Sequence, residues 1–288
     1  MQDKSSMMLR LLLNRYHEGT TESVLKGLPE EERRKVLDLP LVSKDVLPAL
    51  RQPIEAMQHV HYSWLIPQLQ SISKRKLRLV ISILPEHLAT KLCDTLKMTS
   101  KPLTLSTPMR SFLRSQLHNA IEFNDVLPVE YLPATEMTRV AKLRKRELVD
   151  LIDYLGLYDL AEEIKHIVDR KLLKSLYECL SKKKHIFLRE CLHQREKLVT
   201  QRLQLEHWDG DCQKLAKLLH HRGMVRLGYA LSGQHPDLLW HITHILDTGR
   251  GEKLSRYYHK EGIPGVTQAL KKQVQIVLKE FNKRERSE

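Results

Sequence analysis

Aromatic residues, glycine and proline are all scarce in this sequence. Aromatic side chains make up 6% of its 288 residues, and it holds only 11 Gly and 12 Pro. Strand-rich folds draw on aromatic residues and need many turns, so this composition disfavours them. Leu dominates the apolar residues, which reach 41% in total, and this favours helices around a sizeable core. We therefore predict an all-α fold of stacked short helices, with helix above about 65% of residues, twice the usual fraction.

Cysteine and long apolar runs are also scarce. The four Cys residues, Cys93, Cys179, Cys191 and Cys212, are scattered with no close pair, which argues for a reducing compartment and against a disulfide framework. No run approaches the ~20 apolar residues that a membrane span needs. The segment MMLRLLL near the start is too short and carries Arg10, so we expect no signal peptide. These features predict a cytoplasmic protein that docks at a membrane only through partners.

Local signatures of catalysis and of metal binding are missing as well. His241 and His244 share a helical face, but no CxxC or HExxH motif accompanies them, so we interpret them as surface or interface residues. The DTGRG segment at 247–251 lacks the phosphate-loop pattern and follows a helix, so we read it as a helix stop. We expect no enzyme, no bound metal and no cofactor.

Positive charge, in contrast, is abundant and uneven. The net charge is +13, and residues 170–202 hold ten Lys or Arg against three Asp or Glu. We expect one basic face there, suited to an acidic protein, acidic lipid or nucleic acid. Its candidate residues are Arg170, Lys171, Lys174, Lys182, Lys183, Lys184, Arg189, Arg195, Lys197 and Arg202. Only Tyr177 and Phe187 offer aromatic stacking within the stretch, so nucleic-acid binding is the less favoured alternative.

Proline and glycine divide the chain into helices and linkers. We predict an N-terminal helical domain at 1–122, a linker at 123–135 that holds two Pro residues, and a C-terminal helical domain at 136–288. Thr107-Pro108 is a helix start. Pro67 is expected to kink a helix, and Gly156 and Gly223 are expected to break two others.

The sequence also repeats one phrase, an apolar helix ending in Leu, then Pro or Asp, then a second helix. A shift of 56 residues places residues 24–36 on residues 80–92, and a shift of 162 places residues 77–92 on residues 239–254. Self-similarity of this kind favours armadillo-like helical repeats arranged in two subdomains.

Two segments are candidates for binding a partner. At the start of a helix near residue 236, Ser232-Gly233 stops one helix and Pro236 begins the next. We expect the side chains of Gln234, His235 and Asp237 to face solvent there, as a rigid polar recognition surface beside Pro236. The alternative is that His235 only caps the helix, which needs no partner. At the amino terminus, a small amphipathic helix at 5–18 carries its apolar residues on one side; these residues are Met8, Leu11, Leu12 and Tyr16. This helix either packs on the body of the protein, the more frequent outcome for a terminal helix, or serves a partner as a groove ligand.

The segment GQHPDLLWHITHILDTGRGEKL resembles a motif of the flagellar rotor switch protein FliG, in which a Glu-His-Pro-Gln phrase opens an armadillo-type helix. His235 and Pro236 match that phrase, whereas Gln234 and Asp237 replace its Glu and Gln. VLKGLPEEERRKVLDLP and ISILPEHLATKL are similar to other helix pairs of the family. The resemblance marks residues 215–260 as a FliG-like unit.

This resemblance implies a function. FliG-like helical proteins are similar to the SctK-type cytosolic component of type III secretion systems. We therefore expect a bacterial, non-enzymatic adaptor at the cytoplasmic side of the inner membrane. Its implied partners are a membrane-ring protein tail and cytosolic ring or sorting-platform components, and a homo-oligomer is compatible with that setting. The alternative is a basic helical nucleic-acid-binding protein.

Overall fold

The computed structural model describes residues 4–17, 19–39, 59–98, 103–120, 126–193 and 202–285. Helix accounts for 72% of the structure, and these residues contain no strand. The prediction of an all-α fold and its helix content is confirmed. Within the same ranges, no helix combines the length and the apolar character required to cross a membrane.

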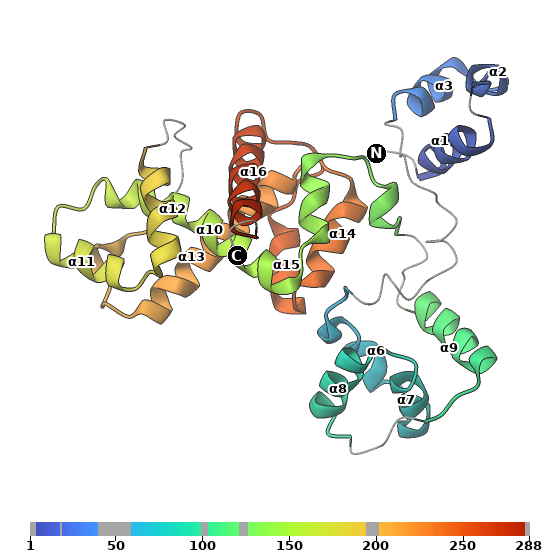
Figure 1. Cartoon of the computed structure of the whole chain (residues 1–288), viewed down its shortest axis with the longest axis horizontal. Coiled ribbons are helices and arrows are strands. Elements are labelled where there is room, and N and C mark those ends of the chain that lie inside the picture. The colour runs from blue at the N-terminus through green and yellow to red at the C-terminus, as the bar shows by residue number, and fades with distance from the viewer. Residues whose placement is uncertain are drawn as a thin grey trace. The chain divides into compact units, whose positions relative to one another are not determined.

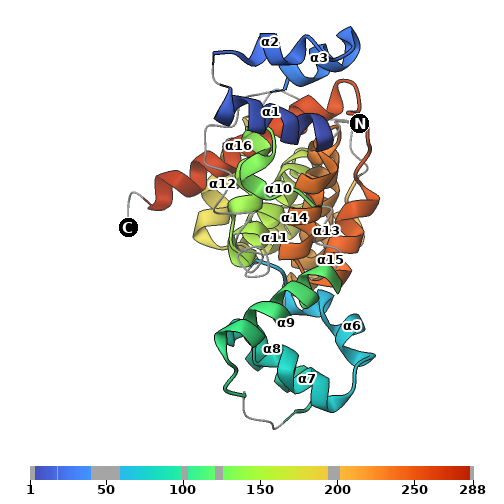
Figure 2. The same ribbon diagram turned by 90° about the vertical axis from the view of Figure 1, so that its right-hand side faces the viewer.

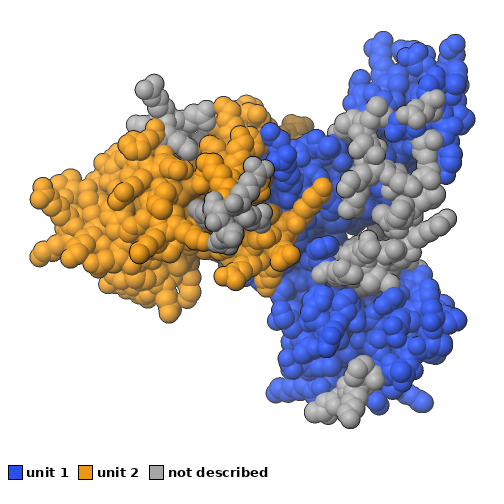
Figure 3. Space-filling view, in the orientation of Figure 1, with its two compact units in different colours: residues 1–141, 235–251 blue, residues 142–234, 252–288 orange. Residues whose placement is uncertain are grey.

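The chain divides into two compact units that do not follow the order of the sequence (Figure 3). Unit 1 comprises residues 1–141 and 235–251, and unit 2 comprises residues 142–234 and 252–288. The expected division at 123–135 differs from this arrangement. The expected FliG-like unit at 215–260 is split, because its middle part packs with unit 1.

Unit 1 consists of short helices (Figure 1). They are α1 Lys4–Tyr16, α2 Thr21–Leu25, α3 Glu30–Leu37, α6 Ile66–Gln70, α7 Lys74–Ile81, α8 Glu86–Thr95, α9 Thr107–Ala120 and α14 Pro236–Ile245, with the 3-10 turns η1 Tyr62–Trp64, η3 Val129–Tyr131 and η4 Glu136–Lys142. The last residue of η4, Lys142, already belongs to unit 2. Helix α15, Thr248–Arg256, spans the junction between the units. Thr107-Pro108 begins α9 as predicted.

The core of unit 1 is mainly leucine. Helices α6 to α9 bury one apolar cluster, in which Leu65 and Leu92 are completely enclosed and to which Trp240 of α14 adds its ring. A second cluster joins α1, α2 and α3 through Leu13, Leu25 and Val36. Burial of such side chains stabilises a fold by roughly 1.5–3 kcal/mol each.

Pro67 was expected to kink a helix, and this is wrong. Helix α6 begins at Ile66, so Pro67 lies in its first turn, where the missing N–H has no intrahelical partner to lose.

The repeated phrase coincides with repeated helix positions. A shift of 56 residues places the start of α3 at Glu30 on the start of α8 at Glu86, and a shift of 162 places the latter on the start of α15 at Thr248. Val36, Leu92 and Leu254, which correspond under these shifts, are all buried. The second helices of the pairs therefore repeat in their start and in one buried position; an armadillo-like stacking of the repeats stays a prediction.

Unit 2 is built from longer helices. They are α10 Lys145–Ile164, α11 Arg170–Glu178, α12 Lys182–Leu192, α13 Cys212–Leu231 and α16 Val266–Glu285, with the 3-10 turn η5 Leu205–His207. Helix α10 packs against α12, α13 and α16 (Figure 2), and α13 also packs against α16. Twelve of the 20 residues of α10 are buried, so it is the central helix of this unit.

Two glycines permit the close approach of α10 and α13. A Cβ atom on Gly223 would lie 1.7 Å from the carbonyl oxygen of Ile152, and one on Gly156 would lie 2.1 Å from that of Leu219. The expected helix breaks at Gly156 and Gly223 are therefore wrong. Both helices run unbroken through these positions, because each glycine meets the backbone of the other helix rather than a turn.

A buried ion pair crosses the interior of unit 2. Arg226 of α13 donates to Asp159 of α10 at 2.6 Å and to the side-chain oxygen of Gln273 of α16 at 2.6 Å. The Arg226 guanidinium also lies over the ring of Tyr158, 5.6 Å from its centroid. Because a buried charge without a partner is costly, a shift of one of these helices that broke the network would lower the stability of unit 2.

A disulfide joins Cys179 to Cys212, against the expectation from sequence. Cys179 caps the end of α11 and Cys212 is the first residue of α13, and their Cα atoms lie 5.1 Å apart. Their separation of 33 positions conceals this proximity in the sequence. Cys93 and Cys191 are free, and burial raises the pKa of the Cys191 thiol to about 12.

Candidate functional site

The start of α14 is not the exposed recognition surface that was predicted. His235 and Asp237 are buried, with exposed fractions of 8% and 6%, and Gln234 is half-buried. Pro236 occupies the first turn of α14 and is exposed. Ile242, Ile245 and Leu246 face inward as expected, whereas Leu239 is only half-buried.

These polar side chains serve the fold. Nδ1 of His235 accepts a hydrogen bond from the backbone N–H of Asp237, which makes His235 the N-cap of α14. Oδ2 of Asp237 accepts from the N–H of Leu127 at 2.9 Å, and Nε2 of His241 lies 2.7 Å from the carbonyl oxygen of Leu127. Helix α14 thus supplies hydrogen-bond partners for both the N–H and the carbonyl oxygen of Leu127, which lies 110 positions before Asp237.

The apolar residues of α1 divide between the interior and solvent. Leu11 is buried against Tyr131, and Met8 packs on the same cluster. Leu12 and Tyr16 are 48% and 61% exposed. The four residues proposed from sequence therefore do not share one exposed face, because two of them pack inward and two are exposed.

Seven of the expected basic residues lie on α11 and α12, and Arg202 is exposed just before η5. Arg195 and Lys197 lie outside the described residues. Lys174 is paired with Glu178 at 3.9 Å, and Lys184 is paired with Asp153 at 2.9 Å.

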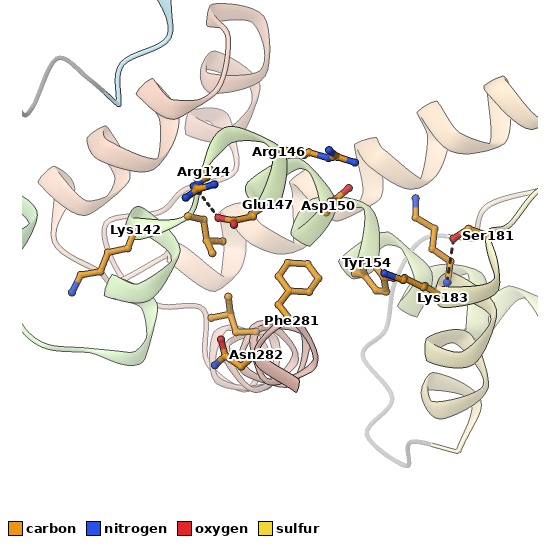
Figure 4. A pocket seen from close by; sticks show the side chains of 13 residues that line it. Lys142, Arg144, Arg146, Glu147, Asp150, Tyr154, Ser181, Lys183, Phe281 and Asn282 are labelled. Atoms are coloured by element: carbon orange, nitrogen blue, oxygen red, sulfur yellow. Dashed lines mark hydrogen bonds between the residues drawn. The ribbon is translucent and has the colours of Figure 1, made fainter. Parts of the chain in front are cut away.

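Lys183 and Lys184 border a cleft of about 710 Å³, the basic cleft, formed where α10, α12 and α16 meet (Figure 4). The cleft is lined by Lys142, Leu143, Arg144, Arg146, Glu147, Asp150, Tyr154, Ser181, Lys183, Lys184, Leu278, Phe281 and Asn282.

Cations border the basic cleft and apolar side chains form its inner wall. Lys142, Arg144, Arg146 and Lys183 are exposed. Phe281 lies between Glu147 and Tyr154 in Figure 4, and its ring packs edge-on against that of Tyr154, with centroids 5.6 Å apart. Five Lys or Arg side chains line the cleft against two carboxylates, so its field attracts negative charge.

Several polar groups at the cleft already have partners. Oε2 of Glu147 accepts from the N–H of Arg144 at 2.7 Å, and Oγ of Ser181 accepts from that of Lys184 at 3.4 Å. Burial raises the pKa of Asp153, but hydrogen bonds from His220 and Lys184 outweigh this and lower the pKa below its ordinary value. Lys184 is therefore held by an ionised Asp153.

Sequence reasoning missed the half of the cleft that α10 and η4 contribute. Lys142, Arg144 and Arg146 stand in the run AKLRKRE, a concentration of positive charge visible in the sequence. This run lies about 40 residues before Lys183, and only the packing of α12 on α10 brings the two together.

Metal-binding geometry is missing from the described part of the chain, where no group of three His, Cys, Asp or Glu side chains converges. His241 binds the Leu127 backbone, and His244 stacks between Trp64 and Trp240. Segment 247–251 is a helix start, contrary to the predicted stop, because Asp247 accepts from the N–H of Arg250 at the first turn of α15.

Comparison of this chain with protein-family models, curated proteins and solved structures gives no match.

Proposed function

We propose that the protein is a non-enzymatic adaptor in the cytoplasmic part of a bacterial type III secretion or flagellar-like apparatus, where it links a membrane ring to other cytosolic components. The observation that carries the adaptor function is the surface of α1. Its inner side is fixed by Met7, Leu11 and Leu13, all buried, while Leu12 and Tyr16 remain exposed.

A fixed helix with exposed apolar residues is suited to protein binding. Leu12 and Tyr16 are held by a helix whose other side is already packed, so little additional backbone entropy is lost when a partner covers them. Tyrosine is among the residues that contribute most to protein interfaces, because it joins a large apolar ring to a polar end.

The assignment to a secretion or flagellar apparatus has two supports. One is the resemblance of residues 233–254 to FliG, which includes His235 and Pro236. The other is the repetition of helix starts at Glu30, Glu86 and Thr248, which suits a family built from helix pairs.

The test is a double substitution, Leu12→Ser with Tyr16→Ser, in the native bacterium. We expect crosslinking to the inner-membrane ring to fall at least about tenfold, while the thermal midpoint of the purified protein stays within about 2 °C. Val168→Ser with Ile186→Ser is the matched control, because these apolar residues are 93% and 64% exposed in unit 2. Equal crosslinking by wild type and the α1 variant contradicts the proposal.

A further inference from the structure

We infer that the basic cleft of unit 2 binds an acidic amphipathic helix of a partner protein, with acidic side chains against its cations and apolar side chains against Phe281 and Leu278. This rests on the proposed adaptor function and gives the chemistry of one partner. It concerns a second surface, separate in sequence from Leu12 and Tyr16.

The charge of the cleft defines the polar side of the partner. Lys142 ends η4, Arg144 and Arg146 flank the start of α10, and Lys183 lies in the first turn of α12. All four are exposed and line one cleft with half-buried Lys184. Arg and Lys side chains pair with carboxylates through charge-assisted hydrogen bonds, and Arg does so in a bidentate manner.

The inner wall defines the apolar side of the partner. Leu143 and Phe281 are half-buried, and Leu278 and Tyr154 are buried beneath them. Phe281 thus offers part of its ring to the cleft while its edge is fixed on Tyr154. An occupant that combines acidic and apolar side chains satisfies both sides of the cleft, whereas a purely polar anion leaves the Phe281 ring exposed to water.

The details of the cleft favour a protein segment over a phosphate-bearing ligand. Phosphate sites at helix starts use backbone N–H groups, but here the N–H groups of Arg144 and Lys184 already donate to Glu147 and Ser181. The carboxylates of Glu147 and Asp150 lie in the same lining and repel a polyphosphate. A helix can place its acidic residues opposite the cations and its uncharged residues opposite these two carboxylates, whereas a polyphosphate carries negative charge along its whole length.

The size of the cleft agrees with this occupant. Its volume of about 710 Å³ is within the range of roughly 300–1,000 Å³ that encloses compact ligands. It therefore admits the side chains from one face of a short helix, the arrangement in which an amphipathic helix enters a groove.

The experiment selects binders from a library of displayed helical peptides against the full-length protein at about 0.15 M salt, where exposed charges are screened beyond ~8 Å. We expect the selected peptides to share Asp or Glu on one side and Leu or Phe on the other. Arg146→Glu with Lys183→Glu should weaken their binding at least about tenfold, and Phe281→Ser should weaken it as well.

The matched control is Lys171→Glu with Lys174→Glu on α11. It changes the net charge by the same amount, but neither residue lines the cleft. Binding to this control within about twofold of wild type supports the cleft, because long-range attraction alone would fall equally in both variants. Arg146→Gln with Lys183→Gln repeats the test if charge reversal disturbs folding.

Three outcomes overturn the inference. They are selected peptides without the acidic and apolar pattern, equal loss of binding in cleft and control variants, and tighter cleft-dependent binding of a single-stranded RNA of about 20 nucleotides. The Leu12→Ser, Tyr16→Ser variant should bind the selected peptides like wild type. If that variant loses crosslinking to the inner-membrane ring but still binds the peptides, the two surfaces act independently. Failure of the adaptor proposal can then be distinguished from failure of the cleft proposal.

Discussion

At the scale of single residues, His244 occupies an unusual place in unit 1. Its ring stacks on Trp240 at 3.8 Å and on Trp64 at 4.2 Å, and its Nδ1 lies 2.8 Å from the carbonyl oxygen of Trp240. Burial lowers the pKa of His244 to about 4; the Trp240 carbonyl opposes this shift, and the charge of His241 adds to it. The ring is therefore neutral in the folded protein at pH values where an unfolded histidine is protonated.

This pKa difference predicts a loss of stability in acid. Because the folded pKa of about 4 lies below the ordinary 6.5, the stabilisation by neutral His244 is complete above pH 6.5 and is lost as pH falls toward 4. Between pH 7 and 4.5 the free energy of unfolding should fall by on the order of 2 kcal/mol from this group. Urea unfolding followed by tryptophan fluorescence measures it. In His244→Phe, which retains a stacked ring, this part of the pH dependence should disappear; an unchanged profile argues against the assignment.

At the scale of helices, the packing of α10 on α13 depends on the absence of a side chain at two positions. Gly223→Ala places a methyl carbon against the Ile152 carbonyl oxygen, and neither backbone can rotate away as a side chain would. We expect a loss of about 3 kcal/mol or more in the free energy of unfolding, although alanine has the higher helix propensity.

Gly249→Ala is the matched control for this prediction. Gly249 is exposed in α15, and the nearest atom to an added Cβ lies 3.6 Å away. The substitution should be neutral or stabilise by up to about 1 kcal/mol. Similar thermal midpoints for the two alanine variants would show that α10 and α13 do not approach as closely as described.

Glycine also shows which features of the helices the sequence could predict. Gly233 has a φ of 72° and ends α13, as expected from the Ser-Gly pair and Pro236. Gly156 and Gly223 have the same chemistry but lie inside helices, because what decides their role is a backbone distant in sequence. Local sequence patterns correctly predicted the helix starts at Thr107 and Pro236. The prediction of helix breaks at Gly156 and Gly223 was wrong, because the role of these residues depends on a helix that is distant in sequence.

The same distinction applies to the candidate sites. Lys183 and Lys184 were identified from local charge density, but the other cations of the cleft belong to α10 and η4. The burial of His235 and Asp237 was not predictable, because the group that covers Asp237 is the backbone of Leu127, 110 residues earlier. The contrast between buried Leu11 and exposed Leu12 was not predictable for the same reason, because Leu11 is covered by Tyr131, which is distant in sequence.

At the scale of the whole molecule, unit 1 is discontinuous in sequence. The indole N–H of Trp64 donates to the carbonyl oxygen of Leu246 across 182 residues, and Ser63 Oγ accepts from the N–H of Thr248 across 185. Loop-closure entropy grows only slowly with length, so such pairings cost little more than shorter ones. Because residues 235–251 supply the partners of Trp64 and Ser63, unit 1 is complete only when this segment is present.

This discontinuity predicts the behaviour of an isolated fragment. In residues 1–141 alone, Trp64 loses its stacking on His244 and its hydrogen bond to Leu246. Trp64 is the only tryptophan of that fragment, so its fluorescence should be quenched by acrylamide far more readily than in the full chain carrying Trp208→Phe and Trp240→Phe. Adding a peptide of residues 235–251 with Trp240→Phe should restore protection, because phenylalanine still offers a ring and α14 still presents Leu246. A peptide of the same composition in scrambled order should not. If Trp64 is equally protected in the fragment without peptide, α14 is not part of unit 1, and the division of the chain at 235–251 is wrong.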